Sequence, residues 1–513
     1  MTSLMPNCGR NVPVELVEAL ALEADVAAPL AVEWLVDNAK TYDAALRAIA
    51  GARESVWISQ LAFDADCVAH GETAAEDTTL LGAIIDATRR VHLDVRILLN
   101  ESLLLDTATS LRAALARASA SYIEVRGISR FPQLLHAKLL IVDMTQAFVV
   151  GSPFVNGYWD DDRHRPIDAR RPMRELGGRP LHDVSMRMTG PVVRALSDIF
   201  AALWSEVGEG GSRGADRVWS RVCAAPAPTH AVRAISTVPR GALPLHPEGR
   251  TEILRAMECG IAQARSLLYI EHQYLSSRAV MRALVASLAR SPGLEVIVLL
   301  NQNPDVTAYR GWQNARLAET GLRAHPRVGL FALWSAERAA DDTLALNQVF
   351  VHSKVIVADD AWATVGSANI DGVSLHSYGS DFESRLGQHV FKDVRNFDVN
   401  LELSEGIDAI AELRHLLWSE HLGIDVDLAT RPRDGWLELW RERAAANVAL
   451  LCSDEAGDAF RAPRSFVLPY SNASTPSAQL ADVGVRNDVI DLRFRPSWLE
   501  VHCSPNWIRN MFA

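Results

Sequence analysis

The sequence predicts an α/β protein made of two tandem homologous α/β sandwich domains followed by a C-terminal appendage. Three observations lead to this fold class. Segments of the first half recur in the same order in the second half, strand-length apolar runs alternate with helical patterns, and a length of 513 residues suits two to three domains. A hydrophobic content of 49% and a charged content of 22% are those of an ordinary globular protein.

Four pairs of segments carry the repeat. The partners follow one another in the same order at a nearly constant offset, which indicates a duplicated domain. The matched segments are ARESVWISQLAF (52–63) with ARSLLYIEHQYL (264–275), LDVRILLNES (93–102) with LEVIVLLNQN (294–303), LLHAKLLIVD (134–143) with FVHSKVIVAD (350–359), and the segments that begin at His182 and Phe397.

Helical patterns and apolar runs alternate within each copy. Residues 41–53 and 77–90 place apolar side chains at i, i+3 and i+4, which is typical of amphipathic helices. Residues 56–63 and 94–99 are short apolar runs, typical of strands buried on both faces. We therefore predict an N-terminal extension (1–34), a first domain (35–210), a linker rich in Gly, Arg, Ala and Pro (211–244), a second domain (245–425) and the appendage (426–513).

The pattern HxKxxxxD occurs once in each copy. On an extended strand, residues two apart leave the same face, so the histidine and lysine of each motif point together. The aspartate has the opposite parity, which favours a structural role although it belongs to the signature. An imidazole beside a fixed positive charge suits phosphoryl transfer. The candidate catalytic residues are His136, Lys138, Asp143, His352, Lys354 and Asp359.

A Gly-Ser turn follows each motif. Ser152, Ser367 and Asn369 are small polar residues that can hold an anion, so we predict them as phosphate-binding residues. The first copy has Phe154 at the position of Asn369, so the predicted phosphate-binding residues differ between the two copies. The chain contains four lysines, and two of them belong to the motifs. A compact ammonium charge suits a phosphate group.

Each imidazole also needs a partner that fixes its tautomer, and carboxylates serve this role. The repeat offers a matched pair, Asp183 and Asp398, each at the start of a strand-like segment after its motif. We predict both as orienting carboxylates.

Charge and cysteine usage limit the function classes. A net charge of -12 argues against nucleic acid as the partner. The six cysteines form no CxxC pair, so we predict neither disulfides nor a zinc site, and we expect no cofactor and no metal. The sequence has no signal-peptide pattern and no long apolar run, so we expect no transmembrane segment and a cytoplasmic protein in peripheral contact with membranes. Export independent of a signal peptide stays open.

Taken together, these residues resemble the phospholipase D superfamily. The resemblance implies the phospholipase D fold, with one active site where the two copies meet. It implies cleavage of a phospholipid at a membrane surface through a covalent phosphohistidine, without a metal, with His136 as the nucleophile and His352 as the general acid. The segments that carry the resemblance are the two HxKxxxxD motifs, NGYWD (156–160), HDVSMRMTGPVV (182–193), YIEHQYL (269–275), GSAN (366–369) and LRHLLWSEHLG (413–423).

Other functions stay open. A nucleic-acid phosphodiesterase would use the same chemistry, but the negative charge disfavours it. A phosphatidyltransferase of the cardiolipin synthase type is disfavoured because N-terminal membrane helices are missing. A binding scaffold without activity would keep the motifs for contact alone. Head-group preference, hydrolysis versus transfer, and the oligomeric state are not determined by the sequence.

Several residues near the motifs have less certain places. His272 in the YIEHQYL segment either lines the pocket or is an ordinary strand-end residue. His164, His182 and His376 are predicted as loop or surface residues. Residues 376–396, which lie between the second Gly-Ser turn and Asp398, are predicted as a loop near the mouth of the site.

Overall fold

The structure is a computed structural model. We call residues 30–207 the first half and residues 231–493 the second half. The described residues are 30–71, 76–102, 105–130, 133–173, 176–207, 231–243, 246–377, 393–404, 408–427, 430–486 and 490–493. Most of the predicted loop at 376–396 therefore lies outside the described residues.

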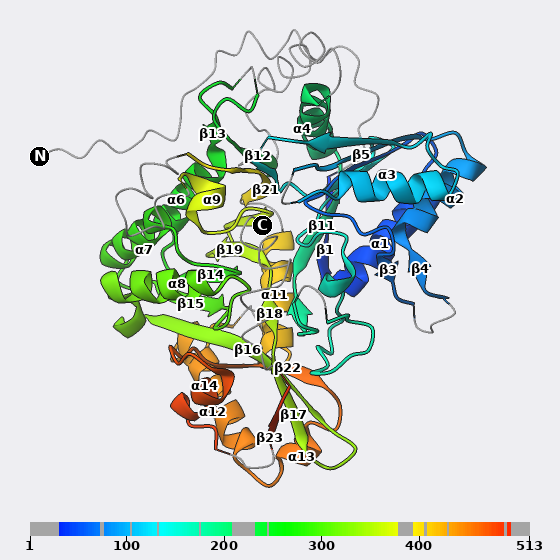
Figure 1. Ribbon diagram of the computed structural model, residues 1–513. Coiled ribbons are helices and arrows are strands. Elements are labelled where there is room, and N and C mark those ends of the chain that lie inside the picture. Colours follow the sequence, from blue (N-terminus) through cyan, green and yellow to red (C-terminus); the bar gives the residue numbers. More distant parts are fainter. Residues whose placement is uncertain are drawn as a thin grey trace, which may run out of the picture.

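Strands of the first half form a seven-stranded sheet, shown at the right of Figure 1. The three strands at one edge run parallel, and the remaining neighbours pair antiparallel. The order is β1 (Ala31–Val36), β11 (Val184–Thr189), β9 (Gln146–Val149), β8 (Leu139–Val142), β2 (Ser55–Ser59), β5 (Asp94–Asn100) and β6 (Glu124–Ile128).

The second half repeats this sheet, with the same order and the same sense for every pair. The sequence repeat thus corresponds to a repeat of strand topology, and the predicted α/β class is confirmed. The equivalent strands, in the same order, are β12 (Val232–Val238), β21 (Asn396–Ser404), β20 (Trp362–Gly366), β19 (Lys354–Ala358), β14 (Leu267–His272), β15 (Glu295–Leu300) and β16 (Val328–Arg338).

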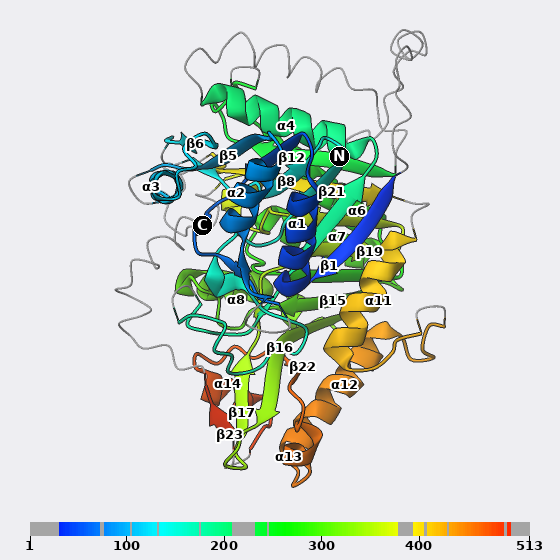
Figure 2. The same ribbon diagram turned by 90° about the vertical axis from the view of Figure 1, so that its right-hand side faces the viewer.

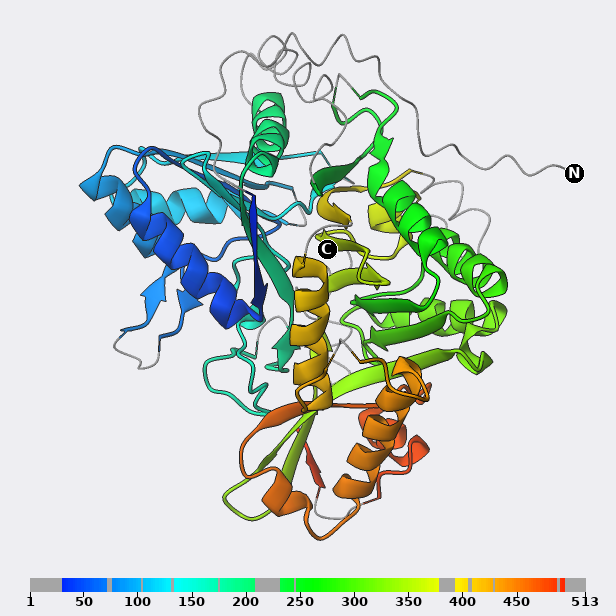
Figure 3. The same ribbon diagram turned by 180° about the vertical axis from the view of Figure 1, so that it is seen from behind.

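Helices cover the outer face of each sheet, and two further helices lie between the sheets (Figures 1 and 3). Alternate residues of a strand point to opposite faces, so Val56 and Ile58 join the outer core of the first half, whereas Trp57 joins a core shared by both sheets. The outer helices are α1 (Asn38–Gly51), α2 (Leu80–Arg90) and α3 (Ala108–Arg117), then α6 (Glu252–Gln263), α7 (Arg278–Arg290) and α8 (Thr307–Glu319); those between the sheets are α4 (Val192–Glu206) and α11 (Ala409–Leu422).

The C-terminal segment extends the second sheet (Figure 2). Strand β22 (Arg464–Pro469) pairs with β16, and β23 (Ile490–Leu492) pairs with β17 (Leu344–Gln348). Helix α12 (Trp436–Leu451) contributes Trp436 and Trp440 to the shared core.

Two strands lie outside the predicted domain bounds. β1 begins in the span predicted as an N-terminal extension, and β12 lies in the span predicted as a linker. Both are outer strands of the repeated seven, and each pairs antiparallel with the strand that follows the Gly-Ser turn of its half. Neither shows the continuous apolar run that marks the central strands, so the sequence pattern misplaced these two boundaries.

Several short elements complete the described chain. Among them, β7, β10 and β18 join the two halves at the site described below. These elements are β3 (Val68–Ala69), β4 (Thr78–Thr79), β7 (Leu134–Leu135), β10 (Leu181–His182), β13 (Arg250–Thr251), β18 (Phe350–Val351), α9 (Gly372–Leu375), α13 (Ala456–Ala459), α14 (Pro476–Asp482) and the 3-10 helices at Asn156–Tyr158 and Leu322–Ala324.

Candidate active site

Two short parallel strand pairs cross from one half to the other beside the motifs. β7 pairs with the start of β21, and β10 pairs with β18. The backbone N–H of His136 donates to Phe397 O at 2.9 Å, and that of His352 donates to His182 O at 2.8 Å. Each motif histidine is therefore tied to the segment of the other half that carries a predicted orienting aspartate.

Buried asparagines hold the residue before each motif histidine. Asn100 Nδ2 donates to Leu135 O, and Leu135 N donates back to Asn100 Oδ1, both at 2.9 Å. In the second half, Asn301 Nδ2 donates to Val351 O at 2.6 Å, and Val351 N donates to Asn301 Oδ1 at 2.8 Å. The asparagine that ends each repeated apolar run thus fixes the backbone next to the imidazole.

The crossing extends to the side chains. His136 Nδ1 lies 2.6 Å from Asp398 Oδ1, and His352 Nδ1 lies 2.8 Å from Asp183 Oδ2. All four side chains are buried, with the imidazoles 2% and 4% exposed. A carboxylate that accepts from Nδ1–H leaves the Nε2 atom available for chemistry. Each half therefore supplies one imidazole and orients the imidazole of the other half.

The motif lysines lie beside these imidazoles. Lys138 Nζ is 3.1 Å from His136 Nε2 and donates to His136 O at the same distance. Lys354 Nζ donates to His352 O. Both lysines are buried, so the part of the chain that the structure describes places two cations and two imidazoles in one enclosed region.

Burial and mutual repulsion shift the pKa values of this group. Burial lowers the pKa of His136 to about 4 and that of His352 to about 3, and the charge of the lysine in the same motif adds to the effect. Burial likewise lowers the pKa of Lys138 to about 7, with repulsion by Lys354, and lowers that of Lys354 to about 8. Near neutral pH both imidazoles are neutral, which is the state that a nucleophile requires.

The serines of the Gly-Ser turns contact the orienting carboxylates. Ser152 Oγ donates to Asp183, and Ser367 Oγ donates to Asp398 Oδ1 at 2.7 Å. These hydroxyl protons, which we predicted to face a phosphate, are already donated to the carboxylates. Burial would raise the pKa of both aspartates, but the adjacent histidine, the nearby lysine and the serine hydroxyl together more than offset it. The pKa of Asp183 is lowered to about 2 and that of Asp398 lies below its usual value.

The glycines of these turns permit the close approach. A Cβ at Gly151 would lie 2.1 Å from Asp183 Oδ1, and a Cβ at Gly366 would lie 2.4 Å from Asn400 Cα. Any side chain would displace the strands that hold the carboxylates, so only glycine fits at both positions.

The second position after each Gly-Ser pair differs between the halves. Asn369 is buried, and its Oδ1 has no hydrogen-bond partner among the described residues. Phe154 packs against Tyr42 and Phe63 in the outer core of the first half. At this position, therefore, the second half has a polar side chain and the first half has an apolar one.

The aspartates that complete the two signatures lie away from the imidazoles. Asp143 Oδ1 accepts from the backbone N–H groups of Glu54 and Ser55 at 2.8 and 2.9 Å. Asp359 Oδ1 accepts from those of Ser266 and Leu267 at 2.9 and 2.7 Å. Each carboxylate braces the start of the neighbouring strand, which is the placement that strand parity indicated.

Gln60 and His272 occupy equivalent positions in the repeat. The sequence analysis did not identify Gln60, and it left the place of His272 open. His272 pairs with Lys354 across β14 and β19, and Gln60 follows β2, which pairs in the same way with β8. Both side chains are fully buried, and among the described residues none of their polar atoms has a hydrogen-bond partner. Burial and the charge of Lys354 hold the pKa of His272 well below its usual value. The alignment of these two residues in the sequence repeat is the signal that could have identified them.

His164 and His182 were predicted as loop or surface residues. His164 does lie in a loop, but both are fully buried, and His182 is in β10. His164 has one nearby partner, Asp160, but the other charged partners of the two histidines include Glu420 and Glu271 from distant segments, which no local pattern marks. His376 is partly buried and keeps its predicted position in a loop.

Family comparisons agree with this geometry. A model described as "Cardiolipin synthase, PLD-like domain" matches residues 257–385, and a model described as "Phospholipase D" matches residues 336–451. Both ranges contain the second HxKxxxxD motif, and the second range also contains Asp398. Residues 257–451 of the chain are therefore similar to the phospholipase D superfamily, and the curated relatives below carry names from it.

Curated relatives carry names from the same superfamily. The chain is 32% identical to phospholipase D zeta 1 of Arabidopsis thaliana over 155 residues, covering 28% of this chain and 14% of that protein. It is 26% identical to phospholipase D of Phytophthora infestans, covering 37% and 13%, and 29% identical to cardiolipin synthase of Clostridium perfringens, covering 25% and 22%. The matched regions thus span less than a quarter of each of these relatives.

Solved structures with related folds are more distant. Phosphatidylserine synthase of Haemophilus influenzae is 13% identical with a TM-score of 0.49, covering 84% of this chain and 95% of that chain. NucT of Helicobacter pylori is 18% identical with a TM-score of 0.23, covering 36% and 91%.

Proposed function

We propose that this chain is a phospholipase D-type phosphodiesterase that removes the head group of glycerophospholipids and releases phosphatidic acid. The observation that carries the proposal is the crossed pair of imidazoles, each held at Nδ1 by a carboxylate of the other half and each beside a buried lysine. This arrangement supplies a nucleophile, an acid and two cations at one phosphodiester.

In the first step, His136 Nε2 attacks phosphorus and the bond to the head-group oxygen breaks. The leaving oxygen takes a proton from Nε2 of His352, so the head-group alcohol departs neutral. The two ammonium groups stabilise the charge on the non-bridging oxygens. Because a bound phosphate offsets the lysine charges, it raises the pKa of His352 and permits the protonation that the acid needs.

In the second step, water attacks phosphorus and the bond to His136 Nε2 breaks. His352, now neutral, accepts the proton of the water and returns to its first state. A primary alcohol can replace water, in which case the product is a phosphatidyl alcohol. The same site thus supports transphosphatidylation.

The alternative substrates are less well supported. A nucleic-acid phosphodiesterase would need a cationic surface, whereas the chain carries a net charge of -12. A phosphatidyltransferase of the cardiolipin synthase type would use the same steps with a lipid alcohol as acceptor. Among the described residues, no helix is long and apolar enough to cross a membrane.

The test uses the purified full chain and mixed phospholipid vesicles, with and without a chelator and with and without a primary alcohol. We expect phosphatidic acid, plus a phosphatidyl alcohol when alcohol is present, measured by mass spectrometry. Cleavage of DNA or of a generic diester without any lipid product would support the nuclease function instead. Vesicles incubated with the His136→Ala variant are the control for non-enzymatic release.

A further inference from the structure

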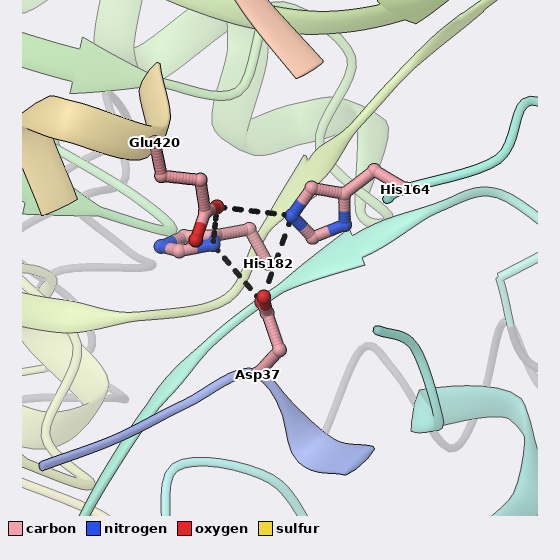
Figure 4. Close-up of side chains that lie close together, drawn as sticks. All are labelled: Asp37, His164, His182 and Glu420. Carbon is pink, nitrogen blue, oxygen red and sulfur yellow. Dashed lines mark hydrogen bonds and ion pairs between the residues drawn. The ribbon is translucent and has the colours of Figure 1, made fainter. Parts of the chain in front are cut away.

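A second polar cluster, formed by Asp37, His164, His182 and Glu420, contains none of the motif residues and is not used in the proposed reaction (Figure 4). His182 Nδ1 lies 3.0 Å from Asp37 Oδ1 and 3.1 Å from Glu420 Oε1. His164 Nε2 lies 3.6 Å from the same Asp37 oxygen and 3.2 Å from the same Glu420 oxygen. Two imidazole nitrogens and two carboxylate oxygens therefore converge on one point.

The four side chains come from four separate segments. Asp37 lies between β1 and α1, His164 is in the loop after the 3-10 helix at 156–158, His182 is in β10, and Glu420 is in α11 of the second half. The first three are at most 1% exposed. Asp37 has φ 67° and ψ 151°, a backbone conformation that residues other than glycine rarely adopt.

Ordinary hydrogen bonds do not satisfy this cluster. Neither oxygen of Asp37 and neither ring nitrogen of His182 has a hydrogen bond of acceptable geometry to any described residue, although all are buried. Within the cluster, the 3.2 Å contact between His164 Nε2 and Glu420 Oε1 has hydrogen-bond geometry, whereas the short contacts of Asp37 and His182 lack the directions that hydrogen bonds require. Atoms that point at a common centre instead of at one another are arranged as metal ligands are.

The remaining nitrogen of each imidazole faces a further carboxylate. His164 Nδ1 lies 3.0 Å from Asp160 Oδ2, and His182 Nε2 lies 2.9 Å from Glu271 Oε1. A carboxylate on the far nitrogen fixes the tautomer and orients the ring of a metal-bound histidine. His164 has this arrangement with hydrogen-bond geometry, whereas the contact of His182 Nε2 with Glu271 is an ion-pair distance without that geometry.

We propose that Asp37, His164, His182 and Glu420 bind one Zn²⁺ ion that joins the two halves. A tetrahedral site with bonds of about 2.0–2.1 Å places its ligand atoms about 3.3 Å apart. The four imidazole–carboxylate pairs are 3.0–3.6 Å apart, and all four ligand atoms lie within 4.8 Å of one another. Two imidazoles and two carboxylates suit zinc, and the two negative charges balance the ion. The cysteine pattern gave no hint of this site because it contains no cysteine.

The ion would not take part in the reaction itself. It would hold in place a segment that carries one of the orienting carboxylates. His182 precedes Asp183, and its carbonyl oxygen accepts from the backbone N–H of His352. A metal at His182 therefore fixes the segment that orients the proposed general acid. Of the four proposed ligands, Glu420 also lines a pocket of about 520 Å³, together with Lys40 and Arg464 among others.

The test is the metal content of the purified full chain, measured by plasma mass spectrometry after growth with zinc and without chelator. We expect about one zinc per chain, and less than about 0.2 in His164→Gln and Glu420→Gln. His415→Gln is the matched control, because it removes a partly exposed histidine of the same helix α11 and should keep the zinc.

A second measurement protects the test against variants that do not fold. Replacement of the bound ion by Co²⁺ in the wild-type chain should give the intense visible absorption of a tetrahedral site. A wild-type chain that stays metal-free after incubation with excess Zn²⁺ would overturn the proposal and leave the cluster as an ion-pair network. Equal zinc loss in His415→Gln would also overturn it. Neither readout depends on lipid turnover, so this proposal and the proposed function can fail separately.

Discussion

The two halves present nearly the same half-site, and the few differences lie around it. In both halves an asparagine at the end of a parallel strand holds the residue before the motif histidine, and a serine after a glycine donates to the aspartate that orients the other histidine. The repeated backbone topology therefore places the histidine, the lysine and the aspartate in the same way in both halves.

The differences concern the neighbours of this constant core. Gln60 in the first half is replaced by His272 in the second, and Phe154 by Asn369. Ser353 donates to the buried Glu271, whereas the equivalent residue of the first half is an alanine. The duplicated frame supplies the chemistry, and divergence of the surrounding residues makes the two imidazoles unequal.

The largest effect should come from removing either imidazole, and the leaving group should tell the two apart. His136→Ala and His352→Ala should each reduce kcat on a natural phospholipid by about 10⁴-fold. A p-nitrophenyl phosphodiester needs little protonation of its leaving group, so it should restore a burst of about one p-nitrophenol per chain in His352→Ala, whose second step still lacks its base, but not in His136→Ala. Rescue of His136→Ala instead would mean that His352 is the nucleophile and His136 the general acid.

The crossed carboxylates should follow the histidines that they orient. Asp398→Asn and Asp183→Asn should each reduce kcat by about 10²–10³-fold on a natural lipid, because the imidazole loses its fixed tautomer. The p-nitrophenyl substrate should rescue Asp183→Asn, whose partner is His352, and not Asp398→Asn. Equal rescue of both variants would contradict the crossed pairing.

The pH profile should report the two lysines. Their lowered pKa values, about 7 for Lys138 and about 8 for Lys354, mean that each ammonium is lost as the pH rises through that range. Because the proposed reaction uses both ammonium groups, we expect kcat/KM to fall by roughly 500-fold between pH 7 and pH 9. In Lys138→Arg, whose guanidinium stays protonated, the remaining decline should move toward pH 8. An unchanged profile in that variant would exclude Lys138 as the titrating group.

The equivalent residues Gln60 and His272 should affect substrate binding more than the chemical step. His272→Ala should raise KM for a natural phospholipid by about tenfold, the loss of roughly one hydrogen bond, with a smaller change in kcat. Gln60→Ala is the matched variant in the other half, and comparison across head groups would show which half contacts the head group. A fall in kcat with unchanged KM would speak against a binding role.

The smallest effect on turnover is expected for the signature aspartates. Asp143→Asn and Asp359→Asn each remove the charge that accepts several backbone N–H groups, which should lower the free energy of unfolding by about 1–2 kcal/mol. Their kcat should stay within about twofold of the wild type. Chemical denaturation and lipid assays on the same preparations measure both quantities. A large loss of kcat with unchanged stability would indicate that these residues have a catalytic role.

The sequence by itself determined the α/β class, the internal repeat and the pairing of each histidine with its lysine. These features are local, since strand parity and repeated spacing depend only on neighbours along the chain. Parity likewise indicated that Asp143 and Asp359 point away from the imidazoles, where the structure places them.

Only the tertiary structure decided which aspartate faces which histidine, and where His164 and His182 lie. The crossing of β7 with β21 and of β10 with β18 brings together residues that are hundreds of positions apart. The same packing turns the serines toward carboxylates and buries a histidine–carboxylate cluster between the halves. Such contacts depend on how two sheets meet, and that geometry leaves no periodic trace in either copy of the repeat.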